Sequence, residues 1–228
     1  MLKEIPFDKH GNCQYGIYRA IIEQKDLGHF RYNHNNKYTH HDLFLANKLG
    51  LKISLIQDEK VNVLLYSRDT LMSGRFMFEK YVTTLYNLKE KGISIAKLLM
   101  NSLWGMLSQK IVYKLSYKPG DTIDIQKGRS IVAMRPTQDM KGDIVEIVKN
   151  TKMFKYNYAR MKPFLMADGR KLIVLKMLPY IETVIRCHTD GFITTKKLPE
   201  KELGENMGYL KYEGSLDIID VLNNNMYK

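Results

Sequence analysis

Apolar and polar positions alternate in three short stretches of the first 70 residues. These stretches are rich in β-branched and aromatic side chains, which favour β-strands. The strands expected from them are residues 16–22, 51–56 and 61–66. A helix is predicted over residues 40–49, because Thr39 can cap it, Asp42 suits its first turn and Gly50 can end it.

A helical period follows this region. Apolar residues recur every three or four positions over residues 75–91, Gly92 interrupts the pattern, and a second apolar helix is expected over residues 93–107. Two helices joined by so short a turn form an antiparallel hairpin. Four apolar side chains of the second helix are expected to pack into a core: Leu98, Leu99, Leu103 and Met106.

Strand patterns return after the hairpin. Residues 111–117 and 143–148 alternate, and Pro119, Gly120 and Asp121 supply turn chemistry between them, which predicts β-hairpins. The segment as a whole, residues 111–160, gives no clearer pattern.

A long helix and a last hairpin are expected next. The helix is predicted over residues 164–185, with an interruption near Gly169 or Pro179. Two apolar runs then flank a polar turn, and Asp190 lies near its tip. The elements together predict an α+β fold with mixed or antiparallel sheets and a helical-hairpin insertion.

The charge of the chain favours an anionic partner. Lysine and arginine number 36 against 24 acidic residues, a net charge of +12, and nucleic acid is the first expectation. The two cysteines are far apart in the sequence, so we expect neither a disulfide framework nor a zinc site, and an intracellular location fits. No run approaches the ~18 apolar residues that span a bilayer, so no membrane partner is expected.

One face of the second hairpin helix carries candidate chemistry. Lys97, Asn101, Trp104 and Ser108 are spaced to share that face. An ammonium on a rigid helix can hold a phosphate, and an aromatic ring one to two turns away can stack on a base. An amphipathic core helix with a solvated lysine is the alternative interpretation of the same pattern.

The stretch resembles motif B of the family B DNA polymerases, K-x-x-x-N-S-x-Y-G. Lys97, Asn101, Ser102 and Gly105 match it, and Trp104 replaces the tyrosine. The resemblance implies that Lys97 binds the triphosphate of a deoxynucleotide. It also implies that Asn101, Trp104 and Gly105 form the floor under the nascent base pair.

A second lysine is implied by the same resemblance. In protein-primed members, a lysine on the first fingers helix joins the motif B lysine in binding the triphosphate. Lys89 falls at that position, and Lys91 is the competing choice. Either could also be a solvated lysine at a helix end, where cations are favoured.

The turn around Asp190 resembles motif C of the family, Y-x-D-T-D-S. Thr189 and Asp190 match, whereas His188 stands in place of the first aspartate and Gly191 in place of the serine. The resemblance implies that Asp190 is a catalytic carboxylate that binds Mg²⁺ in a two-metal site.

Three residues near the end of the sequence are implied DNA contacts. Tyr209 and Lys211 lie in a segment similar to the one that follows motif C and opens a strand. Tyr227 lies where the family's K-x-Y motif ends, with Asn225 in place of the lysine.

Motif A, D-x-x-S-L-Y-P, and the exonuclease motifs are not recognised in the sequence. The early aspartates all lack the residues that should follow: Asp8, Asp26, Asp42, Asp58 and Asp69. The resemblance therefore implies a C-terminal polymerase portion. Its expected domains are palm over residues 1–70, fingers over 71–110, palm again over 111–205 and the start of the thumb over 206–228.

The implied function is template-directed DNA synthesis by a viral or plasmid type of polymerase. Its partners would be a primer–template, deoxynucleoside triphosphates and a separate N-terminal polymerase part, in the host cytoplasm or nucleus if the source is viral. The alternative is a non-catalytic nucleic-acid-binding protein derived from a polymerase, which accounts for the charge, for His188 and Gly191 and for the unrecognised motif A.

Overall fold

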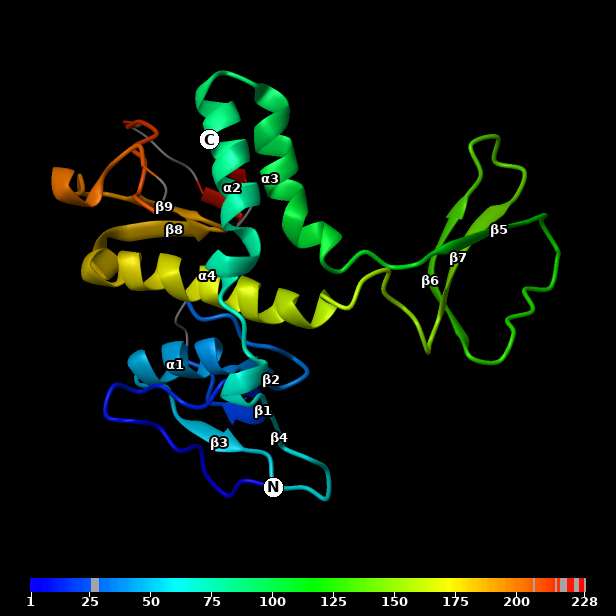
Figure 1. Cartoon of the computed structure of the whole chain (residues 1–228), viewed down its shortest axis with the longest axis horizontal. Coiled ribbons are helices and arrows are strands. Elements are labelled where there is room, and N and C mark those ends of the chain that lie inside the picture. Colours follow the sequence, from blue (N-terminus) through cyan, green and yellow to red (C-terminus); the bar gives the residue numbers. More distant parts are fainter. Residues whose placement is uncertain (26–28, 207, 216, 218–220, 224–225, 228) are drawn as a thin grey trace. The chain divides into compact units, whose positions relative to one another are not determined.

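The computed structural model describes the chain except for residues 26–28, 207, 216, 218–220, 224–225 and 228 (Figure 1). It divides into two units, one made of Met1–Leu71 with Met166–Lys228 and the other of Met72–Leu165. Helices and several small antiparallel sheets alternate along the chain, which confirms the α+β class. The palm, fingers and thumb assignments stay predictions.

The first unit begins with a small antiparallel sheet around one long strand. β1 (Gly16–Ile22) pairs with β2 (Lys37–Thr39), β3 (Ile53–Leu55) and β4 (Val63–Leu65). The three strands predicted from alternation are therefore confirmed, with β3 and β4 shorter than expected.

Helix α1 (His40–Lys48) starts where its sequence predicts. Thr39 is its N-cap, and a reciprocal capping box joins Thr39 to Asp42, whose Oδ2 accepts from the Thr39 N–H at 2.9 Å. Gly50 follows the helix with a φ of 68°, a left-handed conformation that glycine adopts without steric cost. Local capping chemistry therefore fixes both ends of α1.

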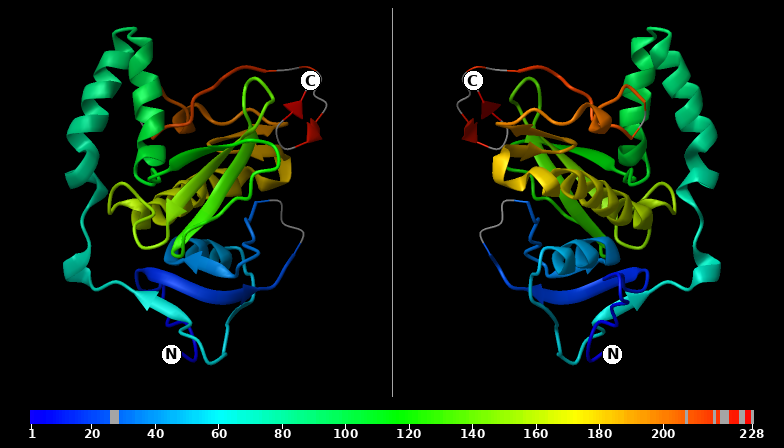
Figure 2. Two further views of the ribbon diagram at one scale, coloured as in Figure 1. Left: turned by 90° about the vertical axis from the view of Figure 1, so that its right-hand side faces the viewer. Right: turned by 90° about the vertical axis from the view of Figure 1, so that its left-hand side faces the viewer.

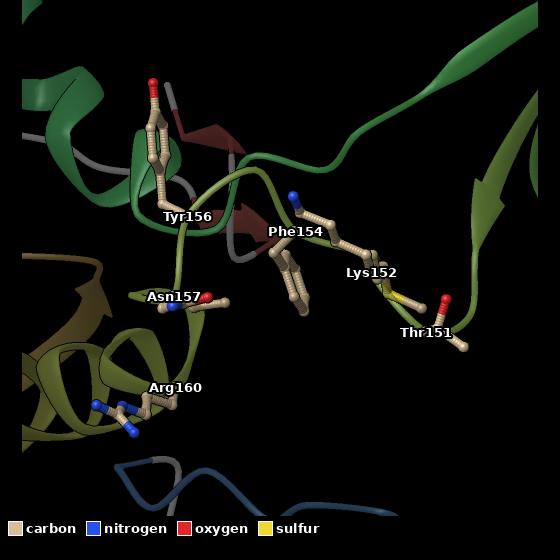
Figure 3. A pocket seen from close by; sticks show the side chains of 8 residues that line it. Thr151, Lys152, Phe154, Tyr156, Asn157 and Arg160 are labelled. Atoms are coloured by element: carbon tan, nitrogen blue, oxygen red, sulfur yellow. The ribbon is translucent and has the colours of Figure 1, made fainter.

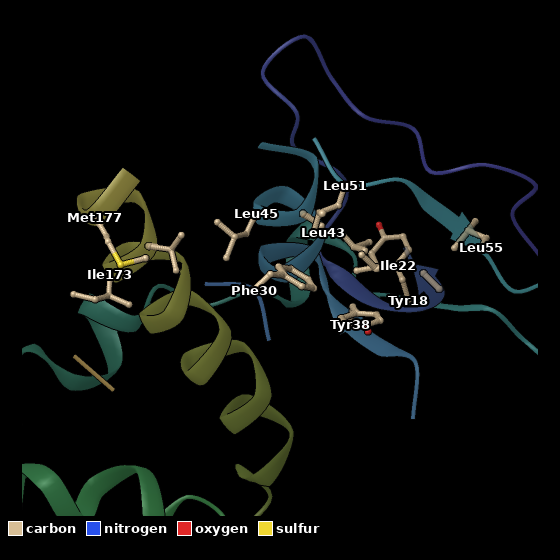
Figure 4. Packing of buried hydrophobic residues seen from close by; sticks show 13 residues of the cluster. Tyr18, Ile22, Phe30, Tyr38, Leu43, Leu45, Leu51, Leu55, Ile173 and Met177 are labelled. Carbon is tan, nitrogen blue, oxygen red and sulfur yellow. The ribbon is translucent and has the colours of Figure 1, made fainter. Parts of the chain in front are cut away.

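One hydrophobic core joins this sheet and α1 to the later part of helix α4 (Figure 4). Tyr18 on β1, Leu43 on α1 and Met177 on α4 are fully buried in it. Burying a side chain of this size contributes about 1.5–3 kcal/mol. The core therefore fixes residues 166–177 against the N-terminal sheet, although the two segments are distant in the sequence.

Helix α4 (Lys162–Met177) ends earlier than the sequence pattern suggested. A 3-10 segment, η3 (Leu178–Thr183), follows it, and Val184 already belongs to a strand. The expected helix to residue 185 is wrong because Pro179 has no N–H to donate and its ring clashes with the preceding turn. Of the two expected interruptions, Pro179 ends the α-helix, whereas Gly169 lies inside it.

The predicted hairpin around Asp190 is confirmed. β8 (Val184–His188) pairs antiparallel with β9 (Gly191–Thr194), so Thr189 and Asp190 form the turn. The strand expected after Gly208 is not seen among the described residues there, where Leu210 makes one isolated parallel bridge to Leu203. Short elements complete this unit: η1 (Arg68–Thr70), η4 (Glu200–Glu202), β10 (Val221–Asn223) and β11 (Met226–Tyr227).

The second unit contains the predicted helical hairpin. α2 (Gly74–Glu90) and α3 (Ser94–Met106) run antiparallel and are joined by a tight turn (Figure 2). The expected core role of the α3 side chains is wrong for Leu98, Leu99 and Met106, which are 63%, 42% and 49% exposed. A two-helix hairpin can bury only the narrow stripe between its helices, here occupied by Leu85 and Ala96.

A three-stranded sheet follows the hairpin in the same unit. Its order is β5 (Tyr113–Tyr117), β7 (Asp143–Lys149), β6 (Arg129–Pro136), all antiparallel. Two of these strands were predicted, and β6 was not, because its sequence mixes arginines and a proline into the apolar run. The 3-10 turn η2 (Ala159–Met161) then leads into α4.

Candidate nucleotide and nucleic-acid sites

The turn between α2 and α3 sets the geometry of the helical hairpin. Gly92 has a φ of 81°, its N–H donates to the Lys89 carbonyl at 2.9 Å, and the Ile93 N–H donates to the Leu88 carbonyl at 3.1 Å. This pair of hydrogen bonds is a Schellman motif, which satisfies the last carbonyls of α2. The turn therefore brings the last turn of α2 and the first turn of α3 to one end of the hairpin.

Lys89 and Lys97 both lie at that end. Lys89 forms an ion pair with Glu90 at 3.2 Å, and its ammonium lies 5.1 Å from the centroid of the Tyr86 ring. Lys97 is exposed in the first half of α3, and no ion pair or hydrogen bond joins its ammonium to another described residue. Lys97 is therefore the less engaged of the two cations.

The remaining predicted residues of α3 follow along the helix. Asn101 is exposed, Trp104 is 46% exposed, and Gly105 has no atom within 4 Å of where a Cβ would stand. Lys97 and Trp104 are separated by roughly two helical turns, about 10 Å along the axis. Within α3, an ammonium, an amide and an indole are therefore open to a ligand of nucleotide size.

Two residues that the sequence did not single out fix this helix. The Tyr81 hydroxyl on α2 donates to the Leu99 carbonyl at 2.8 Å. The Lys162 ammonium lies 4.6 Å from the centroid of the Trp104 ring and donates to Ser108 Oγ at 3.0 Å. Local sequence patterns do not predict contacts between residues so distant in the sequence.

In the first unit, Asp190 is exposed in the turn between β8 and β9. Thr189 has a φ of 50°, and its hydroxyl donates to Asp190 Oδ1 at 3.0 Å and lies 3.3 Å from His188 Nδ1. A carboxylate in this position suits Mg²⁺, which prefers oxygen ligands. No group of three or more histidine, cysteine or acidic residues able to hold a metal occurs among the described residues, so Asp190 fits as one ligand and the set is incomplete.

The predicted DNA contacts near the end of the chain follow that turn in the sequence. The Tyr209 side chain is exposed, and its Cγ would lie 2.9 Å from a Cβ added at Gly204. Lys211 forms an exposed ion pair with Glu205 at 3.0 Å, which adds little stability. Tyr227 lies in β11, but its side chain, like the whole of Asn225, falls outside the part of the chain that the structure describes.

A partly buried polar cluster joins α1 to α4 in the first unit. Arg170 pairs with Asp42 at 2.9 Å, and the Lys171 ammonium lies 3.0 Å from His41 Nδ1. The His40 and His41 rings contact each other with their centroids 3.9 Å apart and their planes tilted by 40°. Burial, and then the charges of His41 and Lys171, lower the pKa of His40 to about 4, so this imidazole is neutral at pH 7.

Comparison with known proteins bears on the family of the chain. A family model described as DNA polymerase type B, organellar and viral, matches residues 30–175, which is more than half of the chain. No curated protein matches the chain, and no solved structure does. No helix among the described residues is long and apolar enough to cross a membrane.

Proposed function

The chain belongs to the family B DNA polymerases of the organellar and viral type, and we propose that it takes part in template-directed DNA synthesis. The observation that carries this proposal is the position of α3 inside the matched residues. Its exposed face has the motif B lysine, asparagine and aromatic residue in order. Asp190 and the predicted DNA contacts lie beyond the match, so their roles rest on the motif resemblance alone.

Nucleotide binding is the step assigned to the helical hairpin. Lys97 would bind the triphosphate through charge-assisted hydrogen bonds, and its ammonium has no competing acid among the described residues. Lys89 would join it only by leaving Glu90, an exchange that costs little because exposed ion pairs are weak. Trp104 would contribute its open ring face to the nucleoside, between Asn101 and Gly105.

Asp190 would bind Mg²⁺, which when bound neutralises phosphate charge and lowers the pKa of the attacking hydroxyl. A two-metal site needs a second carboxylate, and we propose that a separate polymerase part supplies it. Tyr209, Lys211 and Tyr227 would contact the primer–template.

A second candidate function is favoured by one specific observation. His188 and Gly191 flank Thr189 and Asp190 at positions where the family motif has an aspartate and a serine. A cationic or neutral imidazole in place of a carboxylate weakens metal binding. The chain would then be a nucleic-acid-binding protein that keeps the nucleotide and DNA contacts but does not turn over.

Primer extension separates the two functions. The chain is incubated with a primer–template, deoxynucleoside triphosphates and Mg²⁺, beside Asp190→Asn and a control, Asp124→Asn, that removes an exposed acid elsewhere. Extension that only Asp190→Asn abolishes supports synthesis with the proposed metal role, and extension that persists in this variant refutes that role. Primer–template binding without extension by the chain alone is expected of both functions. Extension restored by adding a polymerase part that carries the second carboxylate then supports synthesis, and no restoration supports the second function. Loss of both binding and extension contradicts both.

A further inference from the structure

One segment of the second unit is basic and aromatic throughout. Residues 149–162 contain no aspartate or glutamate. Their five basic residues are Lys149, Lys152, Lys155, Arg160 and Lys162, and their aromatic residues are Phe154, Tyr156 and Tyr158. This composition combines the two groups that single-stranded nucleic acid requires, cations for phosphates and rings for bases.

The segment is fixed at both ends and in its middle. At its first end, the Asn150 N–H donates to the Gly128 carbonyl at 2.9 Å. The Ile111 N–H donates to the Met153 carbonyl at 2.9 Å, and the Lys155 N–H donates to the Gln109 carbonyl at 2.8 Å. These bonds pair it with the chain just after α3. At its other end, Lys162 contacts Trp104. The side chains between these anchors are therefore presented on an ordered loop.

The loop surrounds a hollow of about 480 Å³ (Figure 3). Lys152, Phe154, Tyr156, Asn157 and Arg160 are among its lining residues. The volume lies within the range of about 300–1,000 Å³ usual for small-ligand sites. The lining offers two cations, two aromatic rings and an amide, which is the set of groups a nucleotide unit can use.

The charges and rings of the hollow are available to a ligand. No ion pair joins Lys152 or Arg160 to another described residue, unlike Arg135 in the same unit, which pairs with Glu146. Tyr156 is 40% exposed, and the Lys155 ammonium lies 5.4 Å from its ring centroid. A cation near one ring face leaves the other face for stacking and adds attraction for phosphate.

We propose that this hollow binds single-stranded DNA, with one base stacked on Tyr156 and the adjacent phosphates held by Lys152 and Arg160. A single strand fits better than a duplex because a base can stack on a side chain only when it is free of its own stack. The residues of this site are distinct from those of α3, Asp190 and the predicted contacts near the C-terminus; the proposal rests on the proposed function and deepens it by assigning residues to single-stranded DNA.

Binding of a labelled oligothymidylate to the whole chain, followed by fluorescence anisotropy, tests the stacking contact. Tyr156→Ala should weaken binding about tenfold, because base–aromatic stacking contributes ~1–3 kcal/mol per base. Tyr156→Phe keeps the ring and should bind like the wild type. Equal binding by Tyr156→Ala, or equal weakening of a duplex of the same length, would overturn the stacking role.

The salt dependence of the same binding tests the phosphate contacts. Changing both Lys152 and Arg160 to glutamine should reduce the slope of log Kd against log salt by about 1.4, since each single-strand phosphate contact contributes ~0.7. A control that changes Lys118 and Lys127 to glutamine removes the same charge from exposed positions elsewhere. Equal slopes for the two double variants would overturn the site. Deoxynucleotide binding at α3 should stay unchanged in all of them, which separates this site from the proposed function.

Discussion

Replacing Lys162 by methionine tests the contact that fixes Trp104. Methionine keeps an unbranched apolar chain of similar reach but removes the ammonium. Two interactions are lost, the contact with the indole at 4.6 Å and the hydrogen bond to Ser108 Oγ at 3.0 Å. Every other described contact of α3 is expected to remain.

The size of the effect follows from the exposure of the two partners. A cation over an indole contributes ~0.5–1 kcal/mol at exposed sites and ~2 or more when desolvated. Trp104 is 46% exposed and Lys162 is half-buried, so a value of about 1 kcal/mol is appropriate. A partly exposed hydrogen bond adds ~0.5–1 kcal/mol. Lys162→Met should therefore lower the free energy of unfolding of the second unit by about 1.5–2 kcal/mol.

The chain has one tryptophan, so intrinsic fluorescence reports on Trp104 alone. Urea unfolding followed by this signal gives the free energy, and the emission of the native protein reports the loss of the adjacent charge. Lys162→Arg should recover most of the stability, because guanidinium also packs on indole. Lys127→Met, a control at an exposed lysine, should change neither quantity. Unchanged emission and stability in Lys162→Met would refute the reasoning.

Three further predictions concern local chemistry. The free energy of unfolding should fall by on the order of 1–2 kcal/mol as the pH drops from about 6.5 to about 4, because the lowered pKa values of His40 and His41 let the unfolded chain bind protons first. Urea midpoints that do not change in this pH window would contradict the prediction, and His40→Gln should reduce the change. Thr39→Ala removes the capping box with Asp42 and should cost about 1–2 kcal/mol, with Thr39→Ser much closer to the wild type in thermal unfolding. Gly92→Ala has space for its Cβ, so the free energy of unfolding should fall only by the cost of a left-handed backbone at alanine, about 1–2 kcal/mol, as measured by calorimetry. An unchanged free energy of unfolding would refute the Schellman turn.

Elements governed by neighbouring residues could be predicted from the sequence. The capping box of α1 and the turn at Gly92 act within a few residues, so α1 begins at the predicted residue and both α1 and α2 end within one residue of the predicted ends. The hairpin around Asp190 follows from two apolar runs and a polar turn. The end of α4 was missed because Pro179 was treated as an interruption, although it ends the α-helix at Met177.

Features that depend on distant residues could not be predicted. Apolar residues of α3 were expected in a core, but Leu98 is exposed. The periodicity predicts that the helix has an apolar face, and it does not predict which element covers that face. The contact between Lys162 and Trp104 joins two segments that are distant in the sequence, so no local pattern predicts it. Motif matching predicted the site residues, and only the three-dimensional arrangement adds Tyr81 and Lys162, which contact α3.

The most direct test of the central claim is calorimetric titration of a deoxynucleoside triphosphate into the chain with Mg²⁺, followed in parallel by Trp104 emission. A bound phosphate held by an ammonium contributes ~1.5–3 kcal/mol, so Lys97→Ala should raise the Kd about tenfold or more. Lys80→Ala, which removes an exposed lysine from the middle of α2, should bind like the wild type. If Lys97→Ala binds the nucleotide as tightly as the wild type, or if the emission of Trp104 does not respond, α3 is not the nucleotide site.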